Sequence, residues 1–423
     1  MQTLLAFIFV FGIIVIVHEF GHFYFAKKSG ILVREFAIGM GPKIFQVHKN
    51  ETTYTLRALP IGGYVMMAGY EDDEDLRLGM PALLVLDENE NVKEIDLTNN
   101  TDRQVGIPVD IIDYDFNQEL SIKGQLSSEE GDSVSYSVNE DAMILKEDGT
   151  KLQIAPANRQ FQNAPLFRRI LTNLGGPLNN FILAILAFTL LAFMQNGVPT
   201  NEAIIGNINT DSSAATTQIK SGDRVLEIND QEVNTWQEMA LIIRDHPNEP
   251  IQLKVESEDE SIYNLSLTPN SFTTEEGEEV GRIGIEVYRN NSFKDKVIFG
   301  FTNTWDLTVQ ISRSIVSLFT GGFSVDDLGG PVAIYNLTGE VAAAGGFFGI
   351  VNFLGFLSVN LGLMNLLPIP GLDGGKLVLN IVEGLRGKPL SEEKETVITL
   401  IGVVILLALM LFITWNDIQR FFF

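Results

Sequence analysis

The sequence contains no cysteine and only four histidines among its 423 residues. Disulfide bonds and thiolate metal sites are both excluded, so a zinc site would need histidine, aspartate or glutamate ligands. Basic residues are also scarce, with 29 lysines and arginines against 54 aspartates and glutamates, for a net charge of −25. A chain of this charge lacks the basic surface that neutralises phosphates, and we therefore expect no nucleic-acid partner.

The acidity is concentrated in two segments. Residues 71–160 hold 22 acidic and 7 basic side chains, and residues 200–290 hold 18 and 6. Hydrophobic residues nevertheless make up 45% of the chain. Together these features predict membrane-spanning segments joined to acidic soluble parts. The N-terminus lacks the basic start and small-residue cleavage site of a signal peptide, so we expect its apolar run to be a retained helix.

Uncharged stretches long enough to cross a bilayer predict a polytopic α-helical membrane protein with about four transmembrane helices. They are expected at 1–26, 166–199, 341–375 and 396–418. The second contains GGPLNN and the third NLLPIPGLDGG. Such sequences predict broken helices, which survive in a membrane when they are buried in protein or line a polar cavity.

Lysines and arginines near the ends of the expected spans predict the orientation of the chain. They flank the first two spans between 27 and 169 and recur in the loop 376–395. These two regions are therefore expected in the cytoplasm, and 200–340 and both termini outside. The protein would be a multi-pass protein of the cell membrane.

The first expected span ends in His18-Glu19-Phe20-Gly21-His22. On a helix, positions four apart share a face, so the imidazoles of His18 and His22 can reach one metal ion. Glu19 lies on a neighbouring face, where it can take a proton from a metal-bound water. Ionisable residues at membrane depth are costly and usually functional.

The third ligand of such a site has to come from a distant segment. His48 and His246 lie in polar contexts without a motif, whereas Asp373 lies in the third expected span. Pro368 and Pro370 remove backbone donors there and would let Asp373 turn inward. The predicted orientation brings Asp373 to the same membrane face as the two histidines, which makes it the best candidate.

These motifs, together with FAIGMGPKIF and YTLRALPIGGYVMMAG, resemble the site-2 proteases, and specifically their bacterial RseP-like branch with one PDZ domain. The resemblance implies a zinc metalloprotease with one Zn²⁺ per chain, held by His18, His22 and Asp373. Glu19 would be the general base. The implied location is a bacterial inner membrane, with the active site near the cytoplasmic face.

The resemblance also implies residues that contact the substrate. Asn365, Pro368 and Pro370 match the family's substrate-contacting stretch. Many relatives have histidine after Asp-Gly-Gly; here the position is Lys376, and we assign it no role. The implied substrates are single-span membrane proteins, such as anti-sigma factors, or signal-peptide remnants.

The remaining segments are expected to form accessory modules. Residues 27–70 predict a membrane-associated β segment of short strands, whose edges around Gly62 and Gly63 could capture a substrate in extended form. Residues 71–165 predict an acidic, β-rich cytoplasmic insert whose function is not readable.

On the other side of the membrane, residues 200–290 predict an extracytoplasmic PDZ domain of α+β type, which could bind a peptide ligand or act as a size filter. Residues 291–340 predict an amphipathic region at the membrane interface.

Two other functions are compatible with parts of the pattern. A metal transporter would explain intramembrane ligands, but it gives no reason for Glu19 beside His18 or for a PDZ domain. An inactive scaffold working through the PDZ domain would make Glu19 and Asp373 dispensable.

Overall fold

The computed structural model describes residues 2–69, 76–98, 106–126, 133–147, 149–195, 197–274, 277–320 and 329–422. It divides into two compact units, Met1–Ala187 with Thr304–Phe423, and Phe188–Asn303. The acidic run 71–75 and residues 321–328 of the expected amphipathic region lie outside the described residues.

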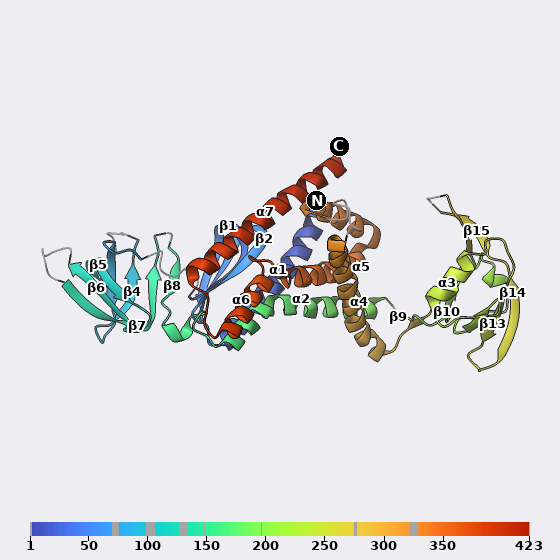
Figure 1. Cartoon of the computed structure of the whole chain (residues 1–423), viewed down its shortest axis with the longest axis horizontal. Helices are drawn as coiled ribbons and strands as arrows, with labels where there is room; N and C mark the ends of the chain where they lie inside the picture. The colour runs from blue at the N-terminus through green and yellow to red at the C-terminus, as the bar shows by residue number, and fades with distance from the viewer. Residues whose placement is uncertain are drawn as a thin grey trace. The chain divides into compact units, whose positions relative to one another are not determined.

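Seven α-helices occur in the described residues (Figure 1): α1 Gln2–Lys28, α2 Leu166–Met194, α3 Trp236–Arg244, α4 Phe293–Thr320, α5 Pro331–Asn365, α6 Asp373–Arg386 and α7 Glu392–Phe422. Among the described residues, α1, α2, α5 and α7 are long and apolar enough to cross a membrane. The chain is therefore a membrane protein with four candidate spans, as the composition predicted. The helix α4 is not among those four.

Some of the expected boundaries and breaks differ from the structure. The helix α5 begins at Pro331, before the expected start of the third segment at 341, so residues 331–340 of the expected amphipathic region are part of this helix. Gly346, with φ 53° and ψ −137°, interrupts the helical backbone and kinks α5. The kink separates residues 331–345 from the rest of the helix, which ends at Asn365. The expected loop 376–395 is largely the helix α6. This helix is amphipathic and contains charged residues, so it does not stand out as an uncharged run in the sequence.

The GGPLNN stretch does not break its helix. The helix α2 runs through Pro177 without interruption. A proline within a helix removes one backbone donor, and a neighbouring helix can compensate for that loss. The prediction of a broken third segment is confirmed, because α5 ends at Asn365 and α6 begins at Asp373.

The membrane helices pack through small residues and one apolar cluster. Val10 and Ile14 of α1 are buried against Phe353, Leu354 and Leu357 of α5. Where α1 meets α2, the backbones approach closely at a pair of glycines. A Cβ on Gly21 would lie 2.0 Å from the carbonyl oxygen of Gly175. Close contact through small residues is the usual way in which membrane helices associate.

The segment 27–70 forms two long bent strands rather than the short strands expected, β1 Val33–Lys49 and β2 Thr52–Met67. Residues 35–38 of β1 are paired on both sides, with 63–66 and with 53–56. The rest of β1 pairs with the first part of β2, from Lys43↔Arg57 to Lys49↔Thr52. The two strands thus make four adjacent segments, and 63–67 is an outer one.

The acidic insert is β-rich, as predicted, and contains β3 Pro81–Leu86, β4 Val92–Asp96, β5 Ile107–Asp115, β6 Ser121–Leu126, β7 Ser133–Leu145 and β8 Lys151–Gln153. The strand order is β4-β3-β5-β6-β7-β8, and an additional β4–β7 pairing closes five strands into a ring. Closure removes the exposed edges of a sheet. The insert surrounds its own core, which includes Leu84, Ile95, Val109, Ile111 and Ile122.

The second unit is an α+β domain around its own apolar core. Its strands are β10 Ile205–Ile208, β11 Arg224–Ile228, β12 Gln231–Glu232, β13 Ile251–Glu256, β14 Ile262–Leu267, β15 Asn270–Thr273, β16 Glu279–Arg282 and β17 Ile285–Val287, with β18 Arg289–Asn290 pairing β9 Val198–Pro199. The main sheet has the order β12-β11-β13-β14. A capping box of Thr235 and Glu238 begins α3.

Candidate metal centre

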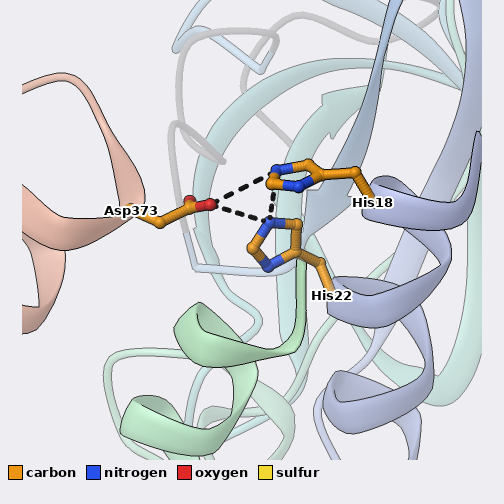
Figure 2. A group of neighbouring side chains, drawn as sticks. All are labelled: His18, His22 and Asp373. Carbon is orange, nitrogen blue, oxygen red and sulfur yellow. Dashed lines mark hydrogen bonds and ion pairs between the residues drawn. The ribbon is translucent and has the colours of Figure 1, made fainter. Parts of the chain in front are cut away.

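Three potential metal ligands converge where α1 meets the start of α6. Figure 2 shows His18 and His22 projecting from one helix and Asp373 reaching them from another. Oδ2 of Asp373 lies 3.3 Å from Nε2 of His18 and 3.2 Å from Nε2 of His22. The two Nε2 atoms are 3.3 Å apart. Among the described residues, these three side chains form a group whose ligand atoms could hold a metal ion.

The tautomer of His22 is set by a contact with α2. Its Nδ1 lies 2.8 Å from the backbone carbonyl oxygen of Thr172. A carbonyl oxygen accepts only, so Nδ1 carries a proton, and in the neutral ring Nε2 is then the nitrogen free to bind a metal ion. Metal-binding histidines commonly donate their other ring N–H in this way.

His18 has a corresponding partner in Asn180, a fully buried residue of α2. The Asn180 amide lies 3.1 Å from Nδ1 of His18, and its other end has no hydrogen-bond partner among the described residues. Because amide oxygen and nitrogen are interchangeable in shape, the arrangement that fits a metal site has the Asn180 oxygen accepting from Nδ1–H. Ser358 of α5 donates to the backbone carbonyl oxygen of Asn180 at 2.8 Å.

These protonation states make the centre suitable for a cation. With neutral rings, the two Nε2 atoms and Oδ2 of Asp373 are acceptors that face one another. The buried Oδ2 atom has the two Nε2 atoms as its polar neighbours among the described residues. Buried acceptors in such proximity are unfavourable unless a cation lies between them. Two imidazoles and one carboxylate are a donor set that catalytic zinc uses.

Glycine at position 176 leaves room for the two imidazoles. A Cβ there would lie 2.3 Å from Nε2 of His22 and 2.7 Å from Cε1 of His18. Such a distance is far inside van der Waals contact. Two residues of the GGPLNN stretch therefore contribute to the centre: Gly176 lies against both imidazoles, and Asn180 contacts the ring of His18.

Glu19 lies beside the β segment. A Cβ on Gly63 would come within 3.2 Å of Cγ of Glu19 and 3.3 Å of Cγ1 of Val15. Gly62, with φ +78°, turns the chain immediately before this contact. The structure thus brings Glu19 and the outer β segment together.

Asp373 is positioned by the break between α5 and α6. Asn365 ends α5, and its side chain donates to the carbonyl oxygen of Leu361 at 3.1 Å. Pro368 and Pro370 lie in the connection that follows. Gly402 of α7 packs directly against Pro370, where a Cβ would lie 2.0 Å from the proline carbonyl oxygen.

The other two histidines lie outside the cluster. Nδ1 of His48 is 3.1 Å from Oγ1 of Thr53, and Nδ1 of His246 is 2.7 Å from the carbonyl oxygen of Ile242. Neither belongs to the group of converging ligands. Sequence reasoning missed the contributions of Thr172, Asn180 and Gly176 to the centre. Their spacing of four residues places them on one face of α2, but it does not by itself indicate that this face meets His18 and His22.

Membrane-length helices with a His-Glu-x-x-His site completed by a distant aspartate define the class of membrane metalloproteases. The model of the family described as Peptidase family M50 matches residues 6–409. The chain belongs to this family.

Several curated relatives match along their whole length. The "Probable protease eep" of Enterococcus faecalis is 47% identical over 426 residues, covering 100% of both chains. A Lactococcus lactis protein named as a candidate zinc metalloprotease is 44% identical, covering 100% of this chain and 99% of its own. A Streptococcus pneumoniae protein with the same description is 41% identical, covering 100% of both chains.

Among solved structures, the chain is similar to PDZ domains of SdrC-like proteins. The domain from Listeria monocytogenes is 16% identical, with a TM-score of 0.18, and the match covers 21% of this chain and 90% of that one. The domain from Listeria innocua is 18% identical, with a TM-score of 0.18, and covers 21% and 97%.

Proposed function

We propose that the protein is an intramembrane zinc metalloprotease that hydrolyses peptide bonds within transmembrane segments. The observation that carries the proposal is the convergence of His18, His22 and Asp373, whose ligand atoms all lie within 4.8 Å of one another. Two of these residues lie on a helix long and apolar enough to span a membrane. Membership of a peptidase family and relatives named as zinc metalloproteases support both the reaction and the metal.

In this proposal His18, His22 and Asp373 hold one zinc ion per chain. Bound zinc would supply Lewis acidity and lower the pKa of an attacking water towards about 7. Glu19 would accept a proton from the attacking water and donate it to the departing amine. Thr172 and Asn180 hold the imidazoles in the tautomers that leave each Nε2 free for the metal.

The β segment gives the substrate a place to become extended. A transmembrane helix hides its carbonyls in backbone hydrogen bonds, so it has to unwind before hydrolysis. Among the described residues no strand pairs with the outer side of 63–67. We propose that the substrate adds there as a strand, beside Gly62 and Gly63 and next to Glu19. The connection containing Asn365, Pro368 and Pro370 would contact the same substrate.

The expected substrates are single-span membrane proteins or signal-peptide remnants within the bilayer. Following the distribution of basic residues, the centre lies near the cytoplasmic face of a bacterial cell membrane, and 200–290 is an extracytoplasmic PDZ domain. That domain contains a cavity of about 580 Å³ between α3 and the residues around β16 and β17. The cavity could hold a peptide ligand.

A Glu19→Gln variant tests the proposal. The amide keeps the shape of the side chain but cannot accept a proton, so we expect normal zinc content and at least about a hundredfold slower cleavage of a transmembrane substrate. A Glu88→Gln variant, altered in an exposed turn of the insert, is the control and should cleave at the wild-type rate.

The alternatives give other outcomes of the same experiment. A transporter would move metal across vesicle membranes and would leave peptides uncut in the wild type. An inactive scaffold would show the same membrane peptides with wild-type and Glu19→Gln protein. Either result would overturn the proposed function.

A further inference from the structure

Glu35 is a buried carboxylate that the proposed mechanism does not use. It lies in β1 and is 2% exposed. Burying a carboxylate costs several kcal/mol unless charged and hydrogen-bonding partners compensate. The partners of Glu35 therefore indicate what this buried charge does in the fold.

Two side chains from β2 satisfy both carboxylate oxygens. Arg57 donates to Oε1 of Glu35 at 3.2 Å, and the Tyr64 hydroxyl donates to Oε2 at 2.7 Å. Arg57 also donates to the Tyr64 oxygen at 2.6 Å and to the carbonyl oxygen of Gly41 at 3.0 Å. The guanidinium lies over the Tyr64 ring, 5.4 Å from its centroid. We call Glu35, Arg57 and Tyr64 the polar clamp.

The polar clamp crosses three adjacent segments of the β sheet. Glu35 belongs to the segment that is paired on both sides, with Thr53 on one side and Met66 on the other. Arg57 belongs to one neighbour of that segment and Tyr64 to the other. Backbone pairing alone allows a strand to slip by one residue, which reverses the faces of all its side chains. The clamp opposes such a slip because its three side chains meet in one register.

The register of Tyr64 determines where the preceding residue, Gly63, lies. Gly63 lies against Glu19, and a Cβ added to Gly63 would be only 2.8 Å from the carbonyl oxygen of Ala37. A movement of the outer segment by a fraction of a residue would change this contact. The polar clamp, which contains the Glu35–Arg57 charge pair, thus fixes the distance between α1 and the outer segment 63–67.

We propose that Glu35, Arg57 and Tyr64 are positioning residues that fix the outer segment 63–67 against Glu19 and thereby select which peptide bond is cut. The inference rests on the proposed function, in which a substrate strand pairs with that segment. A substrate strand takes its register from the edge to which it adds, so a fixed edge yields one cleavage site and a loose edge yields several.

The test is a Tyr64→Phe variant of the full-length enzyme in detergent or vesicles, with a single-span peptide as substrate. The change removes one hydroxyl and leaves one oxygen of the buried Glu35 without its donor. We expect the apparent KM to rise about tenfold. We also expect mass spectrometry of the products to show cleavage at two or more neighbouring bonds, with zinc content unchanged.

Tyr54→Phe is the matched control. Tyr54 lies in the same strand and packs against Phe23 and Phe36. It should keep the single wild-type cleavage site. A Glu35→Gln variant should spread the cleavage sites in the same way, because an amide nitrogen cannot accept from Tyr64.

The outcomes separate the inference from the proposed function. Cleavage by Tyr64→Phe and Glu35→Gln at the wild-type bond with the wild-type KM would overturn the positioning role, while loss of cleavage in Glu19→Gln would still support the protease. A fall in thermal stability without a change in cleavage site would also overturn it, because it would show a merely structural network.

Discussion

At the scale of single residues, the centre depends on a glycine as much as on its ligands. Gly176 faces both imidazoles, and the backbones of α1 and α2 meet closely at the adjacent pair Gly21 and Gly175. An added methyl group would have to displace ring atoms that the contacts with Thr172 and Asn180 hold in place. A small residue at this position would therefore be a requirement of the proposed metal site as well as of helix packing.

A Gly176→Ala variant should accordingly lose zinc. The new Cβ would lie 2.3 Å from Nε2 of His22, which is incompatible with a metal bound to that nitrogen. We expect zinc content well below that of the wild type and loss of cleavage, measured by metal analysis of purified protein. Gly12→Ala on α1 is the control, since a Cβ there meets nothing within 4 Å. Full zinc content in Gly176→Ala would contradict the geometry of the centre.

The assignment of the third ligand leads to a second prediction. Asp373→Ala leaves two imidazoles, so a chelator should remove zinc much faster and cleavage should be abolished. His48→Ala and His246→Ala should keep zinc near one per chain, because both side chains lie outside the cluster. The measurement is zinc release against chelator concentration. Normal zinc content and turnover in Asp373→Ala would exclude Asp373 as a ligand.

The three candidate ligands could be selected from the sequence because their signals are local. His18 and His22 share a face by helical spacing, and the prolines before Asp373 mark a break whatever packs around it. The roles of Thr172 and Asn180 were not predictable in the same way. They depend on how α2 packs against α1, and a backbone carbonyl such as that of Thr172 has no sequence signal at all.

At the scale of elements, charge pairs attach the β hairpin to its neighbours. Asn50 and Glu51 form the turn between β1 and β2 with positive φ values. Glu51 accepts two hydrogen bonds of 2.8 Å from Arg159, a residue that follows β8 near the end of the insert. Lys27 at the end of α1 donates to the Asn50 carbonyl oxygen at 3.0 Å. The turn thus connects α1 to the end of the insert.

This pair gives a prediction for pH dependence. The hydrogen bonds from Arg159 lower the pKa of Glu51. The pair therefore stabilises the fold above the unfolded pKa of about 4.3, and the contribution is lost as the pH falls through the folded value. Both side chains are partly exposed, so we expect a contribution of only about 0.5–1 kcal/mol.

Thermal unfolding of Arg159→Gln measures that contribution. The variant should melt slightly below the wild type at pH 7, and the difference should vanish towards pH 3. Lys123→Gln is the control, because Lys123 and Asp113 form a more exposed pair at 3.6 Å. A difference that stays constant with pH would show that the Glu51 charge is not responsible.

The helix α7 shows what sequence patterns determine at this scale and what they leave open. Its apolar run predicted a span, and most of its large side chains are exposed, as lipid contact requires. Its attachments were not predictable: Gly402 packs on Pro370, and Asp417 accepts from the backbone N–H of Ala333 at 2.9 Å near the start of α5. Both depend on residues far away in the sequence.

At the scale of the whole molecule, the chain combines a membrane unit with an α+β domain that has its own core. The ends of that domain are adjacent, because β9 pairs with β18 and the backbone N–H of Thr200 donates to the Tyr288 carbonyl oxygen at 3.0 Å. A domain inserted in this way can be removed at its base. Its proposed PDZ role can therefore be separated from the chemistry of the zinc site.

Excising residues 201–287 and joining Thr200 to Tyr288 through two glycines should leave zinc content and the cleavage of short substrates unchanged. We expect relaxed discrimination against substrates with long extracellular parts, because the domain would no longer exclude them from the membrane unit. Cleavage is compared across a series of single-span substrates with graded ectodomain length, and Glu19→Gln in the same truncated chain shows that the products come from this enzyme. Unchanged preference across the series would rule out a size filter and leave peptide binding as the role to test for the domain.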